Sequence, residues 1–115
     1  MLNSKEKAQI ICKALDEKQG ENIKLINISK ISLLADYFII TSAKNQSQLQ
    51  ALIDNVELKT KENNINPCKI EGHKSYSWVL LDYNDVIVHI FDSESREYYN
   101  LEKMWSDGIE EKIEY

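Results

Sequence analysis

Apolar residues recur along the first twenty positions at intervals of three and four, the spacing of an amphipathic helix. Asn3 is placed to cap this helix, and Glu6, three residues on, completes a capping-box pair. Gly20 is a plausible stop. The apolar stripe consists of Ala8, Ile11, Cys12 and Leu15.

Two runs rich in β-branched and aromatic residues follow, at 23–28 and 37–41, and each is typical of a strand. The segment KISLLAD between them is a connection with room for one helical turn. A second helix is predicted from Ser47, with Gln50 three residues later, to about residues 63–64. It carries the apolar stripe Leu49, Leu52, Ile53 and Val56 and ends before Pro67.

The second half of the chain predicts three more strands and a final helix. A short strand at 68–71 ends at Gly72, and the runs 77–81 and 86–91 are separated by Asp-Tyr-Asn-Asp, a hairpin signal. Leu101, Met104 and Trp105 then have helical spacing. The order αββαβββα indicates an α/β (α+β) fold: a mixed sheet of about five strands with helices packed against it.

The length of 115 residues suits one domain, 1–115. From about residue 108 the acidic end IEEKIEY is expected to fray by default.

The hairpin WVLLDYNDVIVHIF, residues 78–91, holds the most conspicuous polar residues. With Tyr83 and Asn84 as the central turn residues, Asp82 faces Asp85 and Trp78 faces His89. Side chains alternate along a strand, so one face is aliphatic and predicts the core side. The other face combines aromatic, aliphatic and charged residues, a mixture typical of recognition surfaces.

A metal or catalytic site in this hairpin is disfavoured by distance. Asp85 and His89 are four residues apart on one strand, about 13 Å at roughly 3.3 Å per residue, too far to share one ion. His89 is either a structural histidine stacked on Trp78 or part of a contact surface. The opposed Asp82 and Asp85 either point into water or accept a Lys or Arg from a partner. No phosphate-binding or nucleophile motif is present in the sequence, so no cofactor is expected.

Charge and composition limit the class of partner that the protein is expected to bind. The net charge is -5 and no cluster of Lys and Arg stands out, which disfavours direct nucleic-acid binding as the main activity and favours a basic protein partner. No apolar run approaches the roughly 20 residues of a membrane span. Cys12 and Cys68 lack metal-ligand or redox spacing, so unpaired thiols in the cytoplasm are expected.

Four blocks resemble the ribosomal silencing factor family, also called the Iojap family. They are ADYFIITSA at 35–43, EG at 71–72, the hairpin at 78–91 and REYYNLEKMW at 96–105, and the resemblance runs from about residue 5 to 107. Two departures stand out. Asn84 occupies a position where the family commonly has glycine, and Ser42-Ala43 replaces a commoner Thr-Gly pair.

The resemblance implies a nucleotidyltransferase-like topology without known catalytic activity. It implies binding to the fourteenth protein of the large ribosomal subunit, which blocks joining of the small subunit and lowers translation when nutrients run short. Members of the family also form homodimers. Two alternatives remain: a nucleotidyltransferase-like enzyme, for which Asp82 and Asp85 are wrongly spaced, and a protein-binding adaptor unrelated to ribosomes.

The family motif, carried onto this chain, assigns the partner-binding residues. A first group lines or supports the contact surface: Trp78, Asp82, Tyr83, Asp85 and His89. A second group of candidates follows: Asp36, Arg96, Tyr98, Leu101 and Trp105. For Leu101 and Trp105 the alternative is a helix face packed on the sheet, and for Arg96 it is an ion pair with an acid.

Overall fold

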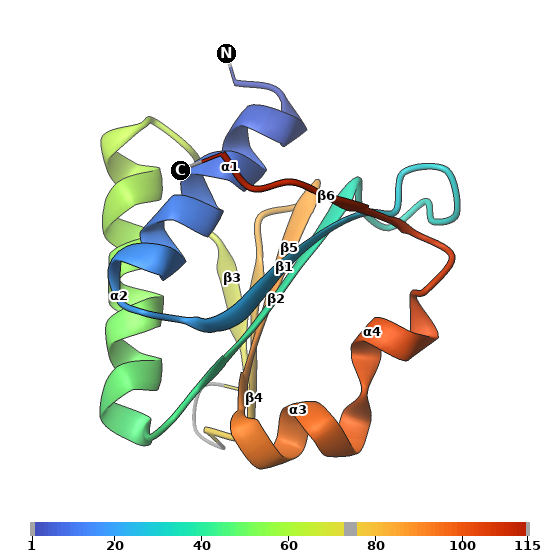
Figure 1. The fold of residues 1–115 in the computed structure, drawn as a ribbon. Helices are drawn as coiled ribbons and strands as arrows, with labels where there is room; N and C mark the ends of the chain where they lie inside the picture. Colours follow the sequence, from blue (N-terminus) through green and yellow to red (C-terminus); the bar gives the residue numbers. More distant parts are fainter. Residues whose placement is uncertain (1, 73–75, 115) are drawn as a thin grey trace.

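A six-stranded sheet with helices on both faces forms the protein in the computed structural model, which describes residues 2–72 and 76–114 (Figure 1). The strand order is β3-β4-β5-β2-β1-β6. In chain order the elements are α1 (Ser4–Glu17), β1 (Glu21–Asn27), β2 (Tyr37–Ala43), α2 (Gln46–Glu62), β3 (Lys69–Glu71), β4 (Trp78–Asp82), β5 (Val86–Asp92), α3 (Ser93–Tyr99), α4 (Leu101–Met104) and β6 (Ile109–Glu111).

The sheet is mixed, which confirms the predicted fold class. The central strands β2 and β5 run parallel, and the other neighbouring pairs are antiparallel. A parallel pair requires a long crossover connection, which α2, β3 and β4 provide here.

The sixth strand, β6, corrects the expectation of about five strands. It pairs with β1 through Leu25↔Glu111, Ile26↔Glu110 and Asn27↔Ile109. The side-chain amide of Asn27 donates to Oε2 of Glu111 at 2.9 Å. Residues 109–111 of the acidic end are therefore paired at the sheet edge, which the charge pattern alone does not reveal.

The two long helices begin at asparagine caps. Asn3 and Glu6 form the predicted capping box of α1. For α2 the cap is Asn45, whose side chain accepts from the backbone N–H of Gln48 at 2.8 Å. The prediction of Ser47 at this start was two residues late, because Asn45 reaches the free amide of the first turn equally well.

Both faces of the sheet are buried. On one face α1 and α2 cover a large core that includes Leu15, Leu52, Leu81 and Val88. On the other face a second core contains Phe38, Ile40, Phe91 and Leu101, with Trp78 and Trp105 packed against it. Strand β2 contributes to both cores and is buried along its whole length.

Helix α3 is an element that the apolar pattern did not predict. Its cap is Asp92, which accepts from the backbone N–H of Ser95 at 2.7 Å. Arg96 is its buried residue, so the helix has no apolar stripe to detect. Asn100, in the left-handed region at φ 46°, then separates α3 from α4.

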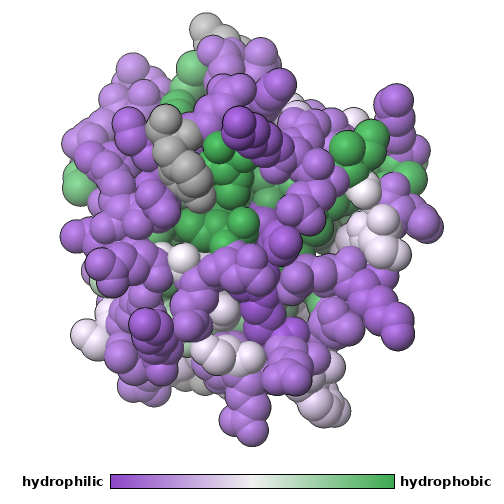
Figure 2. All heavy atoms as spheres, in the orientation of Figure 1, coloured by the Kyte–Doolittle hydropathy of each residue, from purple (hydrophilic) through white to green (hydrophobic). Residues whose placement is uncertain are grey.

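The connection between β1 and β2 carries exposed aliphatic side chains. Leu33 is fully exposed, and Ile31 and Leu34 are also largely open to solvent. Figure 2 shows a hydrophobic group at the upper right, where Figure 1 places this connection. The segment KISLLAD therefore adds apolar surface at the end of the sheet where β2 begins.

Candidate functional site

The β4–β5 hairpin has a different register from the one predicted. Tyr83 faces Val86, and its N–H donates to the Val86 carbonyl at 2.9 Å, so the central turn residues are Asn84 and Asp85. Trp78 consequently pairs with Phe91, and Leu80 pairs with His89. Moving the turn by one residue changes each cross-strand partner by two positions, so the strands keep their predicted faces.

The two acids of the hairpin do not oppose each other, which corrects the expected pair of like charges. Asp82 pairs with Ile87 on β5 and with Lys69 on β3. Its Oδ1 accepts from the backbone N–H of Asn84 at 2.8 Å. The Nζ of Lys7 lies 2.7 Å from Oδ1 of Asp85, so a cation of the chain itself neutralises this acid.

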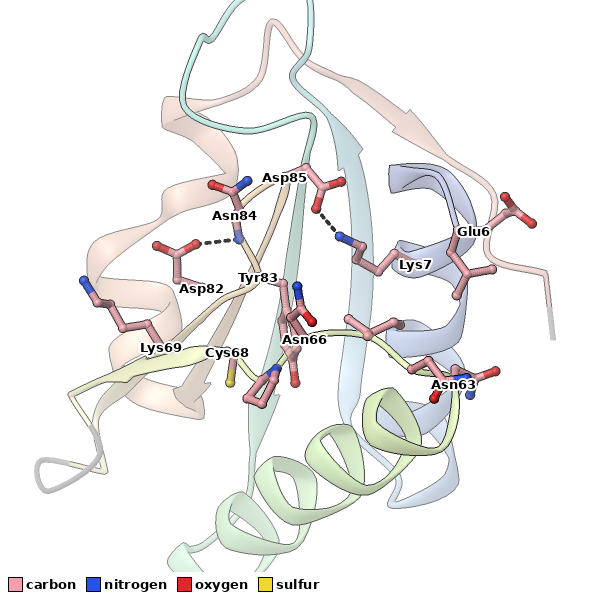
Figure 3. Close-up of a pocket in the computed structure, with 14 residues that line it drawn as sticks. Glu6, Lys7, Asn63, Asn66, Cys68, Lys69, Asp82, Tyr83, Asn84 and Asp85 are labelled. Atoms are coloured by element: carbon pink, nitrogen blue, oxygen red, sulfur yellow. Dashed lines mark hydrogen bonds and ion pairs between the residues drawn. The ribbon is translucent and has the colours of Figure 1, made fainter.

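A polar groove of about 1060 Å³ lies at this end of the hairpin, and we call it the turn groove (Figure 3). Its walls are the start of α1, the α2–β3 connection and the hairpin turn, and the Lys7–Asp85 pair lies at its border with α1. Four asparagines line it beside two lysines and three acids. The lining residues are Leu2, Glu6, Lys7, Asn63, Asn64, Ile65, Asn66, Pro67, Cys68, Lys69, Asp82, Tyr83, Asn84 and Asp85.

Tyr83 forms the floor between the turn groove and the first core. The side chain is buried, and its hydroxyl oxygen lies 3.0 Å from Oγ1 of Thr60 on α2. Burial raises the pKa of the Tyr83 hydroxyl, and burial is also the main cause that raises the pKa of the Cys68 thiol. Both groups are therefore neutral near pH 7, and Tyr83 supports the groove while offering little surface to a partner.

Asp36 joins the start of β2 to the same turn. Its backbone N–H donates to the carbonyl of Asp85 at 2.8 Å, and its own carbonyl accepts from the N–H of Ile28. The backbone of Asp36 thus connects the exposed aliphatic connection to the hairpin. Three predicted site residues, Asp36, Asp82 and Asp85, consequently lie at one end of the sheet.

Trp78 and His89 belong to the opposite side of the sheet from Tyr83. The indole Nε1–H of Trp78 donates to Nδ1 of His89 at 3.1 Å, and the ring of Phe38 packs edge-on against His89 at 4.7 Å. Burial lowers the pKa of His89 to about 4. His89 is 3% exposed, so it orients Trp78 and is closed to solvent.

The tautomer of His89 follows from this contact. Because Nδ1 accepts a hydrogen bond, the neutral ring carries its proton on Nε2. Among the described residues, the buried Nε2 of His89 has no hydrogen-bond partner. A buried N–H without an acceptor costs stability, so the proton on Nε2 of His89 lowers the stability of the fold.

Three more candidates lie on the same side of the sheet as Trp78 and differ in their exposure to solvent. Leu101 is buried in the second core, and the ring of Trp105 packs edge-on against Phe38 at 4.9 Å. Tyr98 is 81% exposed and packs edge-on against Tyr99, which in turn packs 4.8 Å from Trp78. Tyr99 was missed by the sequence analysis, although its place beside Tyr98 in the REYYNLEKMW block was visible.

Arg96 is buried, and its guanidinium bonds to several elements of the protein. Its Nε donates to Oε1 of Glu102 at 2.9 Å, which realises the ion pair considered as the alternative for this residue. Its two terminal nitrogens donate to groups on β1 and β2. Glu102 was not among the sequence candidates.

The predicted residues therefore form two groups, one at the turn end of the β4–β5 hairpin and one on the side of the sheet that carries the second core. One comprises Asp82, Tyr83 and Asp85 in the turn groove, with Asp36 beside them. The other comprises Trp78, His89, Arg96, Tyr98, Leu101 and Trp105. Within residues 2–72 and 76–114, no three His, Cys, Asp or Glu side chains gather in a way that could hold a metal ion. No helix in these ranges has the length and apolar content needed to cross a membrane.

Comparison with known proteins identifies the family. The family described as "Ribosomal silencing factor during starvation" matches residues 1–115. The ribosomal silencing factor RsfS of Bacillus subtilis is 41% identical over 107 residues, covering 93% of this chain and 91% of that protein. The mouse protein named "Mitochondrial assembly of ribosomal large subunit protein 1" is 26% identical over 110 residues, 91% of this chain and 47% of its own length.

The fold agrees with an experimental structure. A crystal structure of a protein from Chromobacterium violaceum superimposes with a TM-score of 0.88 at 30% sequence identity, covering 99% of this chain and 94% of that one. The match of the family over the full sequence and the shared fold point to one conclusion. The chain belongs to the ribosomal silencing factor family.

Proposed function

We propose that this protein represses translation by binding the large ribosomal subunit through its fourteenth protein and thereby preventing the small subunit from joining when nutrients are limiting. The observation that carries the proposal is the family match over residues 1–115. The name of the mouse relative, which refers to the large ribosomal subunit, is consistent with that partner.

The mechanism we propose is steric and needs no chemical step. A bound protein of this size, with extents of 33 × 32 × 25 Å, would occupy space that the opposite subunit needs. The net charge of -5 favours encounter with a basic ribosomal protein and would raise the association rate. Affinity would come from accessible aromatic and acidic side chains, foremost Trp78, Tyr98, Asp82 and Asp85.

The buried candidates support this surface from beneath in our proposal. His89 orients Trp78 by accepting its indole N–H, and Tyr83 anchors the hairpin turn on α2 through Thr60. Leu101 packs in the second core, and Trp105 packs against it and against Phe38. We further propose that the protein acts in the cytoplasm, without catalysis, and that the free protein forms a homodimer.

The decisive experiment is a sucrose gradient of lysate that contains tagged protein. We expect the tag to migrate with free large subunits and to be absent from joined ribosomes. A tag that stays at the top of the gradient at low salt, or that follows the small subunit, would defeat the proposal.

A purified assay separates binding from silencing. Light scattering follows joining of isolated subunits, and added protein should reduce the amplitude in proportion to the large subunits it occupies. Binding to the isolated fourteenth protein would then identify the contact. If the subunits join normally while the protein is bound, the protein is an adaptor without silencing activity and the proposal is wrong.

A further inference from the structure

The bonds of Arg96 link three parts of the fold that are far apart in sequence. The residue is 8% exposed, and its side chain lies where α3, β1 and β2 meet. A charged side chain is rarely buried unless its hydrogen bonds are satisfied. The partners of Arg96 therefore show what this charge holds in place.

The first partners are two backbone carbonyls at an irregularity in β1. The pairing of β1 with β2 shifts register between Glu21 and Lys24, and Asn22 adopts a φ of 43°. Nη1 of Arg96 donates to the Glu21 carbonyl at 2.9 Å, and Nη2 donates to the Asn22 carbonyl at 2.7 Å. A bulge leaves carbonyls without ladder partners, and the planar fork of Arg suits two adjacent oxygens.

Further contacts secure both helices of the C-terminal part. Nη1 of Arg96 also donates to Oγ of Ser42 at 3.3 Å, and Nε donates to Oε1 of Glu102 on α4 at 2.9 Å. At the start of α3, the Ser93 hydroxyl donates to Oε1 of Glu21 at 2.7 Å. The bulge of β1 is thus connected to α3 and, through Arg96, to α4.

These bonds matter because α3 and α4, residues 93–104, have little apolar attachment. Arg96 is the buried residue of α3, and Leu101 is the buried residue of α4. The same segment carries Tyr98 and Tyr99, and the Tyr99 ring packs against Trp78 on β4. The orientation of this aromatic group over β4 consequently depends on how α3 is held.

We infer that Arg96 is a positioning residue: it fastens the α3–α4 segment to the β1 bulge and so fixes Tyr98 and Tyr99 beside Trp78, without contacting the partner itself. The inference rests on the proposed function only where it takes the large ribosomal subunit as the partner. The fastening of the segment is a property of the free protein and can be measured without ribosomes.

Hydrogen exchange of the free protein tests the fastening. In Arg96→Lys the charge remains but the fork is lost, and we expect amides within 93–104 to exchange about tenfold faster or more, as loss of hydrogen bonds to a charged group implies. Amides of β2 and β5 should keep their protection. Unchanged exchange in 93–104, or an equal increase in all elements, would overturn the inference.

Matched variants identify the bonds responsible. Glu102→Gln removes the ion pair but leaves both carbonyl contacts, so a smaller increase confined to the same segment is expected. Glu97→Gln is the control, because Glu97 is an exposed acid of α3. An effect of Glu97→Gln equal to that of Glu102→Gln would show that loss of any acid in the segment loosens it, against the inference that the Arg96–Glu102 pair helps to hold it.

A double-mutant cycle on large-subunit affinity tests whether Arg96 acts through the tyrosines. Measured where all variants are folded, Arg96→Lys should weaken binding in the wild-type background and have little further effect in Tyr98→Ala/Tyr99→Ala. Additive losses would mean that Arg96 contacts the partner directly, against the inference. If the wild-type protein does not bind large subunits, the proposed function fails, while hydrogen exchange still decides the role of Arg96.

Discussion

Lys7 on α1 and Asp85 in the hairpin turn form an ion pair of 2.7 Å between residues 78 positions apart. Both side chains are partly shielded from solvent, with 18% and 31% of their surfaces exposed. The pair joins the first helix to the turn that carries the acidic candidates. Asp85 therefore has a structural partner, whereas Asp82 is bonded to the backbone of its own turn.

Replacing Lys7 with Met should lower the free energy of unfolding by about 1 kcal/mol, since a partly shielded pair lies at the upper end of the range for surface pairs. Urea denaturation measures this change. Lys59→Met is the matched control, because the Lys59–Glu62 pair on α2 is longer, at 3.6 Å, and more exposed. Equal losses for both variants would show that the Lys7–Asp85 pair has no special weight.

Charge reversal of Asp82 should weaken large-subunit binding while the fold is retained. Asp85→Lys is a less clean test, because it places a second ammonium beside Lys7 and destabilises the turn by repulsion. Affinity for purified large subunits, measured at two salt concentrations, checks the prediction for Asp82→Lys. Unchanged affinity would exclude Asp82 from the contact surface, whatever the function.

His89 should make stability pH-dependent in the acid range. Burial holds its pKa at about 4, against 6.5 in the unfolded chain, so below pH 6.5 the unfolded state binds the proton first. Stability should fall as the pH drops from about 6.5 to about 4, by about 3 kcal/mol in total, and this group adds nothing further below that range. Above pH 6.5 its contribution is constant.

Denaturation profiles of the wild type and of His89→Leu from pH 8 to pH 4 isolate this component. The variant should lack this component. Parallel profiles for the two proteins would contradict the neutral, buried state of His89.

Tyr98→Ala should reduce affinity for the large subunit by about tenfold or more, as expected for an aromatic residue at the centre of a contact. Its effect on unfolding should stay within about 0.5 kcal/mol, since the side chain is largely exposed. Leu58→Ala on α2 serves as the control, because Leu58 is an exposed apolar residue outside both candidate groups. Similar losses for both variants would point to non-specific apolar binding.

Asn84 has a φ of 77°, which only glycine adopts without cost. Asn84→Gly should leave the free energy of unfolding nearly unchanged, whereas Asn84→Ala should lower it by about 1 kcal/mol. Thermal unfolding compares the two. A fully stable Asn84→Ala protein would mean that the turn adopts another conformation.

Periodicity predicted most of the architecture because the elements concerned have one-sided burial. The α1 stripe and the aliphatic face of the hairpin, including Val79 and Val88, are fully buried as expected. Helix α3 and strand β6 were missed, since the first is held by Arg96 and the second by backbone pairing and Glu111. Neither kind of attachment produces a periodic pattern of apolar residues in the sequence.

The candidate site was harder to predict because it depends on contacts between distant residues. The hairpin turn was placed one residue early, which created an apparent opposition of Asp82 and Asp85. The cation that neutralises Asp85 comes from α1, and no local pattern indicates Lys7. The hairpin pattern placed Trp78 and His89 on one face, and the family motif added Tyr98 and Trp105, but the packing of α3 and α4 on that face required the structure.

The two edges of the sheet, β3 and β6, are each three residues long, whereas the strands between them have five to seven. Edges this short offer few free backbone groups to an incoming strand, which protects against uncontrolled sheet extension. Recognition by strand addition is correspondingly disfavoured. Recognition of this protein is therefore expected to rest mainly on its side chains, so binding specificity can be altered by point substitutions that leave the sheet intact.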